Sequence, residues 1–243
     1  MIKFLISCSI FLLLLGCSPN DSSSIHLENS APTESYFFQS KEVDIYFPDA
    51  IDSIDIHKIK LISDGAVVAE ISGKNNIIVN DKHIRILNTN QRLTHFDTVV
   101  INDDQENNIK IPVGDYYYEG QITDDTIPAD KEVFIRNKHY KQINGTLIYT
   151  IDFTNIEGST IEFAVPESIN KIATLIEQKT ILKTSDSITY EFHIEIPKNY
   201  FIQKKITNLN FELKADQRYE SSRKTIFKSF IPINIDELNS KAP

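Results

Sequence analysis

The residue types that most often carry chemistry are dispersed along this chain of 243 residues. No two of the histidines lie two to four positions apart, which is the local spacing of metal ligands on one strand or helix. The chain has no Gly-x-Ser-x-Gly, His-Glu-x-x-His or phosphate-binding glycine loop. Its 34 acidic residues allow any carboxylate pairing, so spacing identifies none. We therefore predict a protein that is not an enzyme, with no catalytic residue, metal site or cofactor. The histidines are His26, His57, His83, His95, His139 and His193.

The densest run of possible oxygen ligands is Asn102–Asn107, which reads Asn-Asp-Asp-Gln-Glu-Asn. Calcium favours loops rich in carboxylate and amide oxygens. An EF-hand loop that begins at Asp103 requires glycine at position 108 and glutamate at 114, but the chain has Asn108 and Gly114. The EF-hand is thus excluded, and two interpretations stay open: another kind of calcium loop, or a solvated hairpin tip.

Two short motifs are candidates for contact with a ligand or partner. In the run Tyr116-Tyr117-Tyr118, strand geometry places Tyr117 on the face opposite its neighbours. We assign Tyr116 and Tyr118 to the core, and leave Tyr117 open between core and an exposed ring for a sugar or protein. Lys204 and Lys205 follow an aromatic pair in a basic region, which is either a surface for an acidic partner or a solvated face.

The N-terminus has the charge and length of a secretory signal. Lys3 precedes the apolar stretch 4–15, which is too short to span a bilayer as a helix. The run Leu14-Leu15-Gly16-Cys17 resembles the lipobox of bacterial lipoproteins, with Leu15 bulkier than the small residue favoured there. The resemblance implies a signal peptide over residues 1–16, cleavage between Gly16 and Cys17, and lipid on Cys17.

A lipidated Cys17 would give the protein its membrane affinity, since two lipid signals already anchor a protein stably. Cys8 would leave with the signal peptide, so the mature chain could form no internal disulfide. Ser18 rather than aspartate follows Cys17, which favours the outer over the inner membrane. Residues 17–40 are polar with little periodicity, and we predict that they form a flexible tether.

Beyond the tether, apolar and polar residues alternate in several stretches, with turn residues between them. Period-two alternation with one apolar face is typical of half-buried antiparallel strands. We therefore predict an all-β protein built from β-sandwiches. Only 168–178 fits a helical stripe, and it fits a strand equally well. The alternating stretches are 43–47, 109–113, 147–153, 188–196 and 209–213.

The run Ile111-Pro112-Val113-Gly114-Asp115-Tyr116 resembles the Pro-x-Gly-x-Tyr junction of bacterial immunoglobulin-like and transthyretin-like modules. The resemblance implies that one strand ends at the Pro-Gly turn and that Tyr116 opens the next. Gly114 permits a positive φ, and the Tyr116 hydroxyl can bond to nearby backbone.

The roughly 200 residues after the tether are about twice the length of one seven-stranded sandwich. A polar, proline-containing stretch at 124–130 is the best boundary. We predict two tandem immunoglobulin-like domains at 41–123 and 131–237, with a C-terminal tail at 238–243. A single large sandwich is the alternative.

Charge differs between the two predicted domains. Residues 17–130 hold 8 basic and 20 acidic residues, a net charge of −12, whereas 131–243 hold 16 and 14, a net charge of +2. Such asymmetry indicates separate surfaces, or a well-solvated first domain. A chain with net charge −9 is not expected to bind nucleic acid.

Together these features predict an envelope lipoprotein that serves as a non-enzymatic binding or scaffolding module for another envelope protein. A surface glycan-binding protein that uses Tyr117 is the first alternative. A hydrolase that uses carboxylates is the second.

Overall fold

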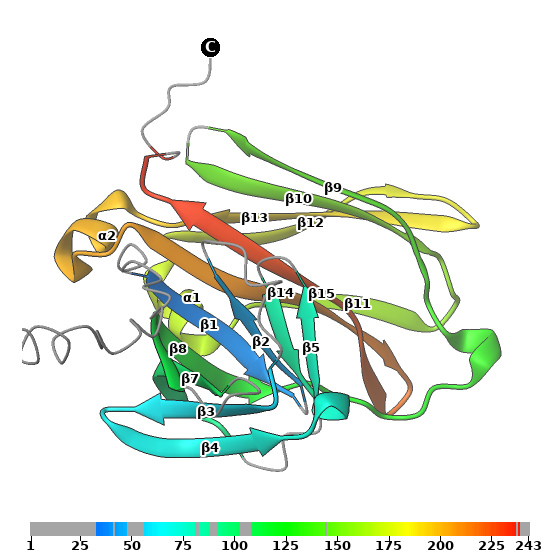
Figure 1. Cartoon of the computed structure of the whole chain (residues 1–243). Helices are drawn as coiled ribbons and strands as arrows, with labels where there is room; N and C mark the ends of the chain where they lie inside the picture. Colours follow the sequence, from blue (N-terminus) through cyan, green and yellow to red (C-terminus); the bar gives the residue numbers. More distant parts are fainter. Residues whose placement is uncertain are drawn as a thin grey trace, which may run out of the picture.

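The computed structural model describes residues 33–40, 42–47, 56–80, 83–87, 92–102, 108–143, 145–236 and 238. Within these ranges the protein is mostly β, with two short α-helices, α1 (Glu167–Ile172) and α2 (Lys198–Lys204) (Figure 1). The coarser part of the fold prediction, a protein made mostly of β-strands, is confirmed. The strands are β1 (Thr33–Gln39), β2 (Val43–Tyr46), β3 (Lys58–Ser63), β4 (Ala66–Ser72), β5 (Ile77–Asn80), β6 (His83–Ile86), β7 (His95–Asn102), β8 (Asn108–Gln121), β9 (Ile135–Ile143), β10 (Thr146–Thr154), β11 (Ser159–Ala164), β12 (Leu175–Lys183), β13 (Ser187–Glu195), β14 (Asn208–Tyr219) and β15 (Ser222–Asn234).

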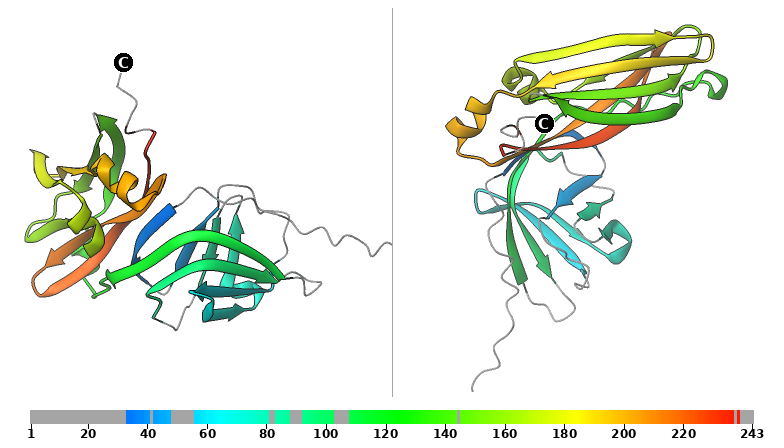
Figure 2. Two further views of the ribbon diagram at one scale, coloured as in Figure 1. Left: turned by 90° about the vertical axis from the view of Figure 1, so that its left-hand side faces the viewer. Right: turned by 90° about the horizontal axis from the view of Figure 1, so that it is seen from above.

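The strands form three sheets. The large sheet has the order β11-β14-β1-β8-β7-β3-β4, and β15 pairs with β14. A four-stranded sheet has the order β12-β13-β10-β9, and a three-stranded sheet has the order β2-β6-β5. Figure 2 shows the four-stranded sheet against one end of the molecule and the three-stranded sheet toward the other.

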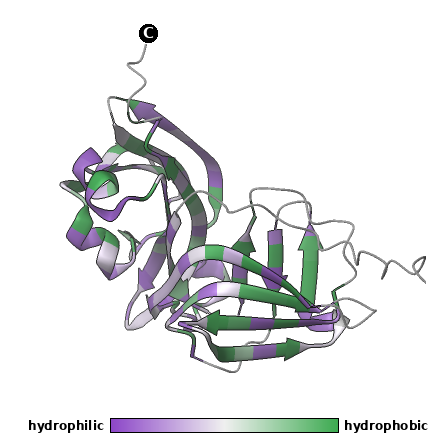
Figure 3. Ribbon diagram, turned by 60° about the vertical axis from the view of Figure 1, so that its left-hand side comes forward, coloured by the Kyte–Doolittle hydropathy of each residue, from purple (hydrophilic) through white to green (hydrophobic). Residues whose placement is uncertain are grey.

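Two hydrophobic cores hold these sheets together. In the N-terminal half, side chains of the three-stranded sheet, such as Ile45 and Ile84, pack against Leu61, Val99 and Tyr116 of the large sheet. In the C-terminal half, alternate residues of β10 and β13 pack against β14 and β15. Apolar and polar residues alternate along these strands (Figure 3), because each lines a core with one face only.

Strand β1 joins the two halves. It pairs in parallel with β14 on one side and with β8 on the other. Tyr36 belongs to the C-terminal core and the next residue, Phe37, to the N-terminal core. We predicted a flexible tether as far as residue 40, but Thr33–Gln39 is this strand. A strand buried on both faces reads as an unbroken aromatic run, so alternation does not reveal it.

The glycine of the Pro-Gly motif bends a strand rather than ending one. Strand β8 runs through Gly114, whose φ is +81°. A Cβ there would lie 2.5 Å from the carbonyl oxygen of Thr33, so glycine lets β1 approach β8. The expected strand junction is therefore wrong, but the expected tie of Tyr116 is confirmed: its hydroxyl accepts from the Tyr46 amide and donates to the Tyr46 carbonyl.

The stretch 168–178, which fits a helix and a strand equally well in sequence, contains parts of both. Residues 167–172 form α1, and β12 begins at Leu175. Pro166 precedes α1 and Ala173 ends it in an extended conformation. A helix is therefore found only over residues 167–172, and the rest of the stretch, from Leu175 on, is a strand.

The stretch at 124–130 lies along the C-terminal half. Asp124 bridges to Lys224 on β15, and the Asp125 carboxylate accepts from the Arg223 amide at 2.8 Å. Just beyond it, the buried Gln217 donates to the Lys131 carbonyl at 2.7 Å. The connection between the two halves is thus bonded to β14 and β15.

Candidate functional site

Lys204 comes near the buried carboxylate of Glu34, and Tyr117 stacks on Tyr36, which bonds to the same carboxylate. Helix α2 follows Pro197 and ends at Lys205, whose φ is +57°. From α2, the Tyr200 hydroxyl donates to Glu34 Oε2, and Lys204 Nζ lies 3.5 Å from Glu34 Oε1. The Tyr36 hydroxyl also donates to Glu34 Oε2, at 3.0 Å.

The contacts of the Glu34 carboxylate indicate that it stabilises the fold. Glu34 is buried, and both of its oxygens have partners. Burial, and next the hydrogen bond to Glu34, raise the pKa of Tyr200 above its usual value, so its hydroxyl stays a donor. Lys204 is paired with Glu34 of the same chain. Lys205 is exposed, and lies in the turn that ends α2.

Tyr117 does not offer a ring face to a ligand. Its ring stacks on Tyr36 at 5.0 Å on one side and on His95 at 4.8 Å on the other. A sugar that stacks on an aromatic platform needs one open ring face. Tyr116 and Tyr118 are buried in the N-terminal core, as predicted.

The same face holds a serine, a histidine and an aspartate in series. Ser63 Oγ lies 2.7 Å from His95 Nδ1, and His95 Nε2 lies 3.0 Å from Asp115 Oδ1. This order of groups can activate a serine hydroxyl. The backbone amide that follows Ser63 is already used, since Asp64 donates to Asp97 Oδ2 at 2.9 Å. It therefore cannot stabilise an oxyanion next to Ser63.

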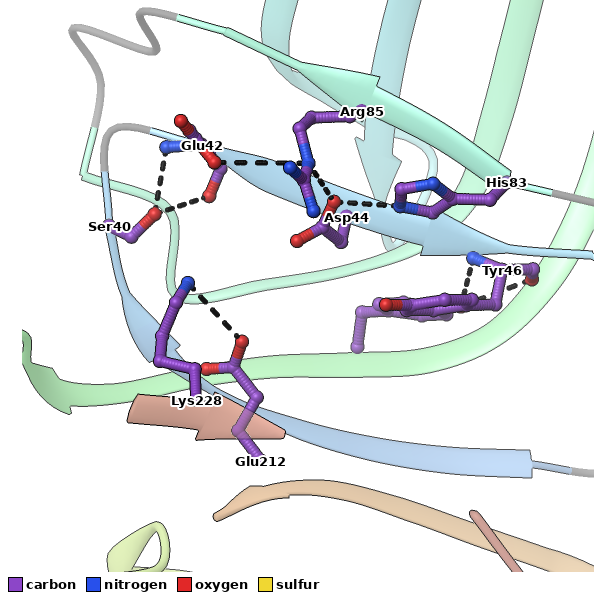
Figure 4. Close-up of polar contacts among 9 residues, drawn as sticks. Ser40, Glu42, Asp44, Tyr46, His83, Arg85, Glu212 and Lys228 are labelled. Carbon is purple, nitrogen blue, oxygen red and sulfur yellow. Dashed lines mark hydrogen bonds and ion pairs between the residues drawn. The ribbon is translucent and has the colours of Figure 1, made fainter. Parts of the chain in front are cut away.

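A second polar cluster lies between the three-stranded sheet and β15 (Figure 4). Asp44 Oδ1 contacts both His83 Nε2 and Arg85 Nε, each at 2.7 Å. Tyr46 stacks between His83 at 4.7 Å and Phe230 at 4.0 Å. The hydrogen bond to Asp44 raises the pKa of Arg85. These contacts tie β6 to β2 and β2 to β15.

Glu212 lies below that cluster in Figure 4, on β14. It is buried, accepts from the Phe38 amide at 2.9 Å, and lies 3.6 Å from Lys228 Nζ. Burial raises the pKa of its carboxyl, and Lys228 opposes that shift. Glu212 thus ties the end of β1 to β14.

The outer edges of the four-stranded sheet are the best candidates for contact with another molecule. Among the described strands, none pairs with the outer edge of β9 or of β12. Eight of the nine residues in each strand are exposed. An open strand edge presents backbone amides and carbonyls to any extended chain.

The β9 edge is cationic and carries an aromatic residue. Arg136, Lys138 and Lys141 lie on it, without an acidic residue in the strand. Tyr140 is 61% exposed while one face of its ring stacks on Tyr149 at 5.5 Å. Sequence analysis missed Tyr140, because a strand exposed on nearly all sides shows no alternation. The only feature of the sequence that could have indicated this edge is the mixture of aromatic and basic residues in the strand.

The β12 edge is apolar at both ends. Leu175, Ile176, Ile181 and Leu182 are all exposed, the last two by more than half. Its middle holds Glu177 and Lys179, whose charged groups lie 2.9 Å apart. This strand was also missed as an edge.

Several predicted features lie outside the described residues: Cys17 and its cleavage site, and most of the Asn102–Asn107 loop. Within the described ranges, no group of three or more His, Cys, Asp or Glu side chains could hold a metal ion. The helices in these ranges are too short to cross a membrane.

No protein-family model matches this chain, and no curated protein matches it.

Proposed function

We propose that this chain is a lipid-anchored lipoprotein of the bacterial envelope and a non-enzymatic binding or scaffolding module for another envelope protein. Its support at the N-terminus is Lys3, the apolar stretch 4–15, and the lipobox-like run that ends in Cys17. Lipid on Cys17 would hold it to the membrane, the outer membrane being favoured. Two immunoglobulin-like sandwiches would then be the frame that displays the binding edge.

The observation that carries the binding role is the β9 edge. A strand of nine residues, eight of them exposed, leaves a long row of backbone groups for a partner strand. Strand addition uses such an edge for affinity and its side chains for specificity. Tyr140 is a large, partly fixed aromatic residue of the kind that dominates binding energies.

The charge of this edge defines the partner. Arg136, Lys138 and Lys141 repel a second cationic strand and attract an acidic one. Lys138 Nζ lies over the Phe227 ring at 5.4 Å, so its position is partly fixed. We therefore propose an extended acidic segment of an envelope protein as the occupant of the β9 edge.

The alternatives have weaker support. A glycan-binding role loses its stacking platform, because both ring faces of Tyr117 are covered. The hydrolase alternative rested on paired carboxylates, whereas the described polar series is Ser63, His95 and Asp115, and there the backbone amide nearest the serine is engaged.

The binding role is tested by a photo-crosslinking amino acid placed at Lys141 in the full chain in cells. We expect one discrete adduct with an acidic envelope protein. The same amino acid at Lys171, an exposed cation on α1, is the matched control and should give no such adduct. Arg136→Glu should abolish the adduct by charge repulsion. Adducts that are equal at both positions, or that resist Arg136→Glu, would overturn the proposal.

The anchor is tested separately by palmitate labelling. We expect labelling of the full chain and none of Cys17→Ser. Protease shaving of intact and lysed cells would then distinguish surface-facing from periplasmic domains. Labelling that persists in Cys17→Ser would refute the lipid assignment.

A further inference from the structure

The edges of the C-terminal half differ in how they are protected. The edge of β11 is closed by the side chain of Gln178, which bonds to its backbone at Ile161 and Phe163. The β9 edge carries three cations and no acid, and lysines on an edge oppose pairing between copies. The β12 edge has neither of these two devices, and its pairing with β13 is regular from Leu175 to Thr180, with a shift of register between Thr180 and Leu182. It combines exposed apolar residues with one charge of each sign at its centre.

That pattern is self-complementary in one register. Side chains directly opposite each other on paired strands lie on the same face. Glu177 and Lys179 pair with His193 and Glu191 of β13, so they lie on the outer face of the sheet. In an antiparallel pair of β12 strands centred on Gln178, Glu177 of each copy faces Lys179 of the other. Each of these two pairs then joins a negative and a positive charge.

The neighbouring registers are unfavourable. Centring on Glu177 places two carboxylates directly opposite each other, and centring on Lys179 does the same with two ammonium groups. Like charges directly opposite each other destabilise a strand pair. The Gln178 register also brings Leu175 of each copy near the irregular end of the other strand, where Ile181 and Leu182 are exposed, so that apolar surface is covered.

We propose that two copies of this chain pair through their β12 edges, antiparallel, about a two-fold axis at Gln178. The four-stranded sheets would then form one continuous sheet across both copies. Such a contact is isologous, so it closes as a dimer and does not grow into a filament. The inference goes beyond the proposed function, because it uses the edge opposite β9.

Charge complementation between two full-length chains tests this pairing. Two differently tagged copies are co-expressed, solubilised in mild detergent and purified through one tag. Wild-type copies should co-purify. Glu177→Lys with itself, or Lys179→Glu with itself, should co-purify about tenfold less, because each places like charges opposite each other.

A mixture of Glu177→Lys with Lys179→Glu should restore co-purification, since both cross-strand pairs regain opposite signs. A general loss of folding cannot produce this rescue. Lys171→Glu makes the same charge change on α1 and should leave co-purification unchanged. Thermal unfolding of each variant verifies the fold.

A disulfide reports the register independently. A chain with Glu177→Cys and a chain with Lys179→Cys should form a mixed disulfide under oxidation. Each variant alone should form far less. Absence of wild-type co-purification, or of rescue in the mixture, would overturn the proposal. Neither result bears on the adduct at the β9 edge, so the two proposals fail separately.

Discussion

The side-chain amide of Gln178 donates a hydrogen bond of 2.9 Å to the backbone carbonyl of Ile161, and so joins the four-stranded sheet to the large one. The Gln178 carbonyl accepts from the Phe163 amide at 3.2 Å. One side chain on β12 thus satisfies two backbone groups on the edge of β11. The gap between β11 and β12 is thus bridged in the C-terminal half, while no described strand pairs with the outer edge of β12.

Removing this closure should weaken the C-terminal half. We expect Gln178→Ala to lower the free energy of unfolding by about 1 kcal/mol, since two hydrogen bonds are lost and water replaces part of them. Gln178→Glu should cost more, because the carboxylate cannot donate to the Ile161 carbonyl. Urea denaturation measures both. Equal stability of all three chains would show that the contact contributes nothing.

Gly114 should be indispensable for the docking of β1. Gly114→Ala introduces a Cβ 2.5 Å from the Thr33 carbonyl oxygen at a positive φ. We expect a loss of about 3 kcal/mol and faster proteolysis within residues 33–39. Gly65→Ala is the matched control, since Gly65 also has a positive φ but open space around it. That variant should lose only about 1 kcal/mol and keep β1 protected. Comparable losses in both variants would refute the role of close approach.

The carboxylate of Glu34 should matter more than the lysine beside it. Glu34→Ala leaves the hydroxyls of Tyr36 and Tyr200 without their charged acceptor. We expect a loss of about 1.5–3 kcal/mol, the range for hydrogen bonds to charged groups. Lys204→Ala removes an exposed partner and should cost less than about 1 kcal/mol. Thermal or urea unfolding of both variants checks the order, and the reverse order would contradict this account.

The strands that sequence predicted best are those with one face in a core. Along β10 and β13 every second residue is buried, which is the alternation seen in their sequences. The central strand β14 was predicted only in part. Its buried residues include Glu212, Lys214 and Asp216, because it lies where both halves and the connection meet. Buried charges paired across the fold have no signature in a local pattern.

The pairing of β1 with β8 and β14, and the open edges of β9 and β12, were not predictable from sequence for physical reasons. Strand β1 pairs in parallel with two strands that are distant in sequence, and parallel pairing leaves no turn signal between partners. The β9 and β12 strands are exposed on nearly all sides, so their residues follow no period. Of the proposed contact residues, Tyr117 stacks between Tyr36 and His95, and Lys204 lies beside Glu34. Tyr140, the exposed tyrosine on β9, was missed.

Glu212, which ties β1 to β14, makes the stability of the fold depend on pH in a defined direction. Burial raises the pKa of its carboxyl in the folded chain. The folded state therefore binds a proton more readily than the unfolded state. The stability from Glu212 is complete below the unfolded pKa and is lost as the pH rises through the folded pKa.

Replacing the ionisable group should remove this dependence. Glu212→Gln keeps an oxygen that can accept from the Phe38 amide, and it carries no buried charge. We expect its free energy of unfolding, relative to the wild-type chain, to be higher at pH 8 than at pH 4. Lys228→Gln should do the opposite, because it removes the cation that favours the ionised carboxylate and so weakens the fold more at pH 8. Urea denaturation across this pH range measures both differences. A stability difference for Glu212→Gln that is the same at both pH values would show that this carboxyl does not titrate with folding.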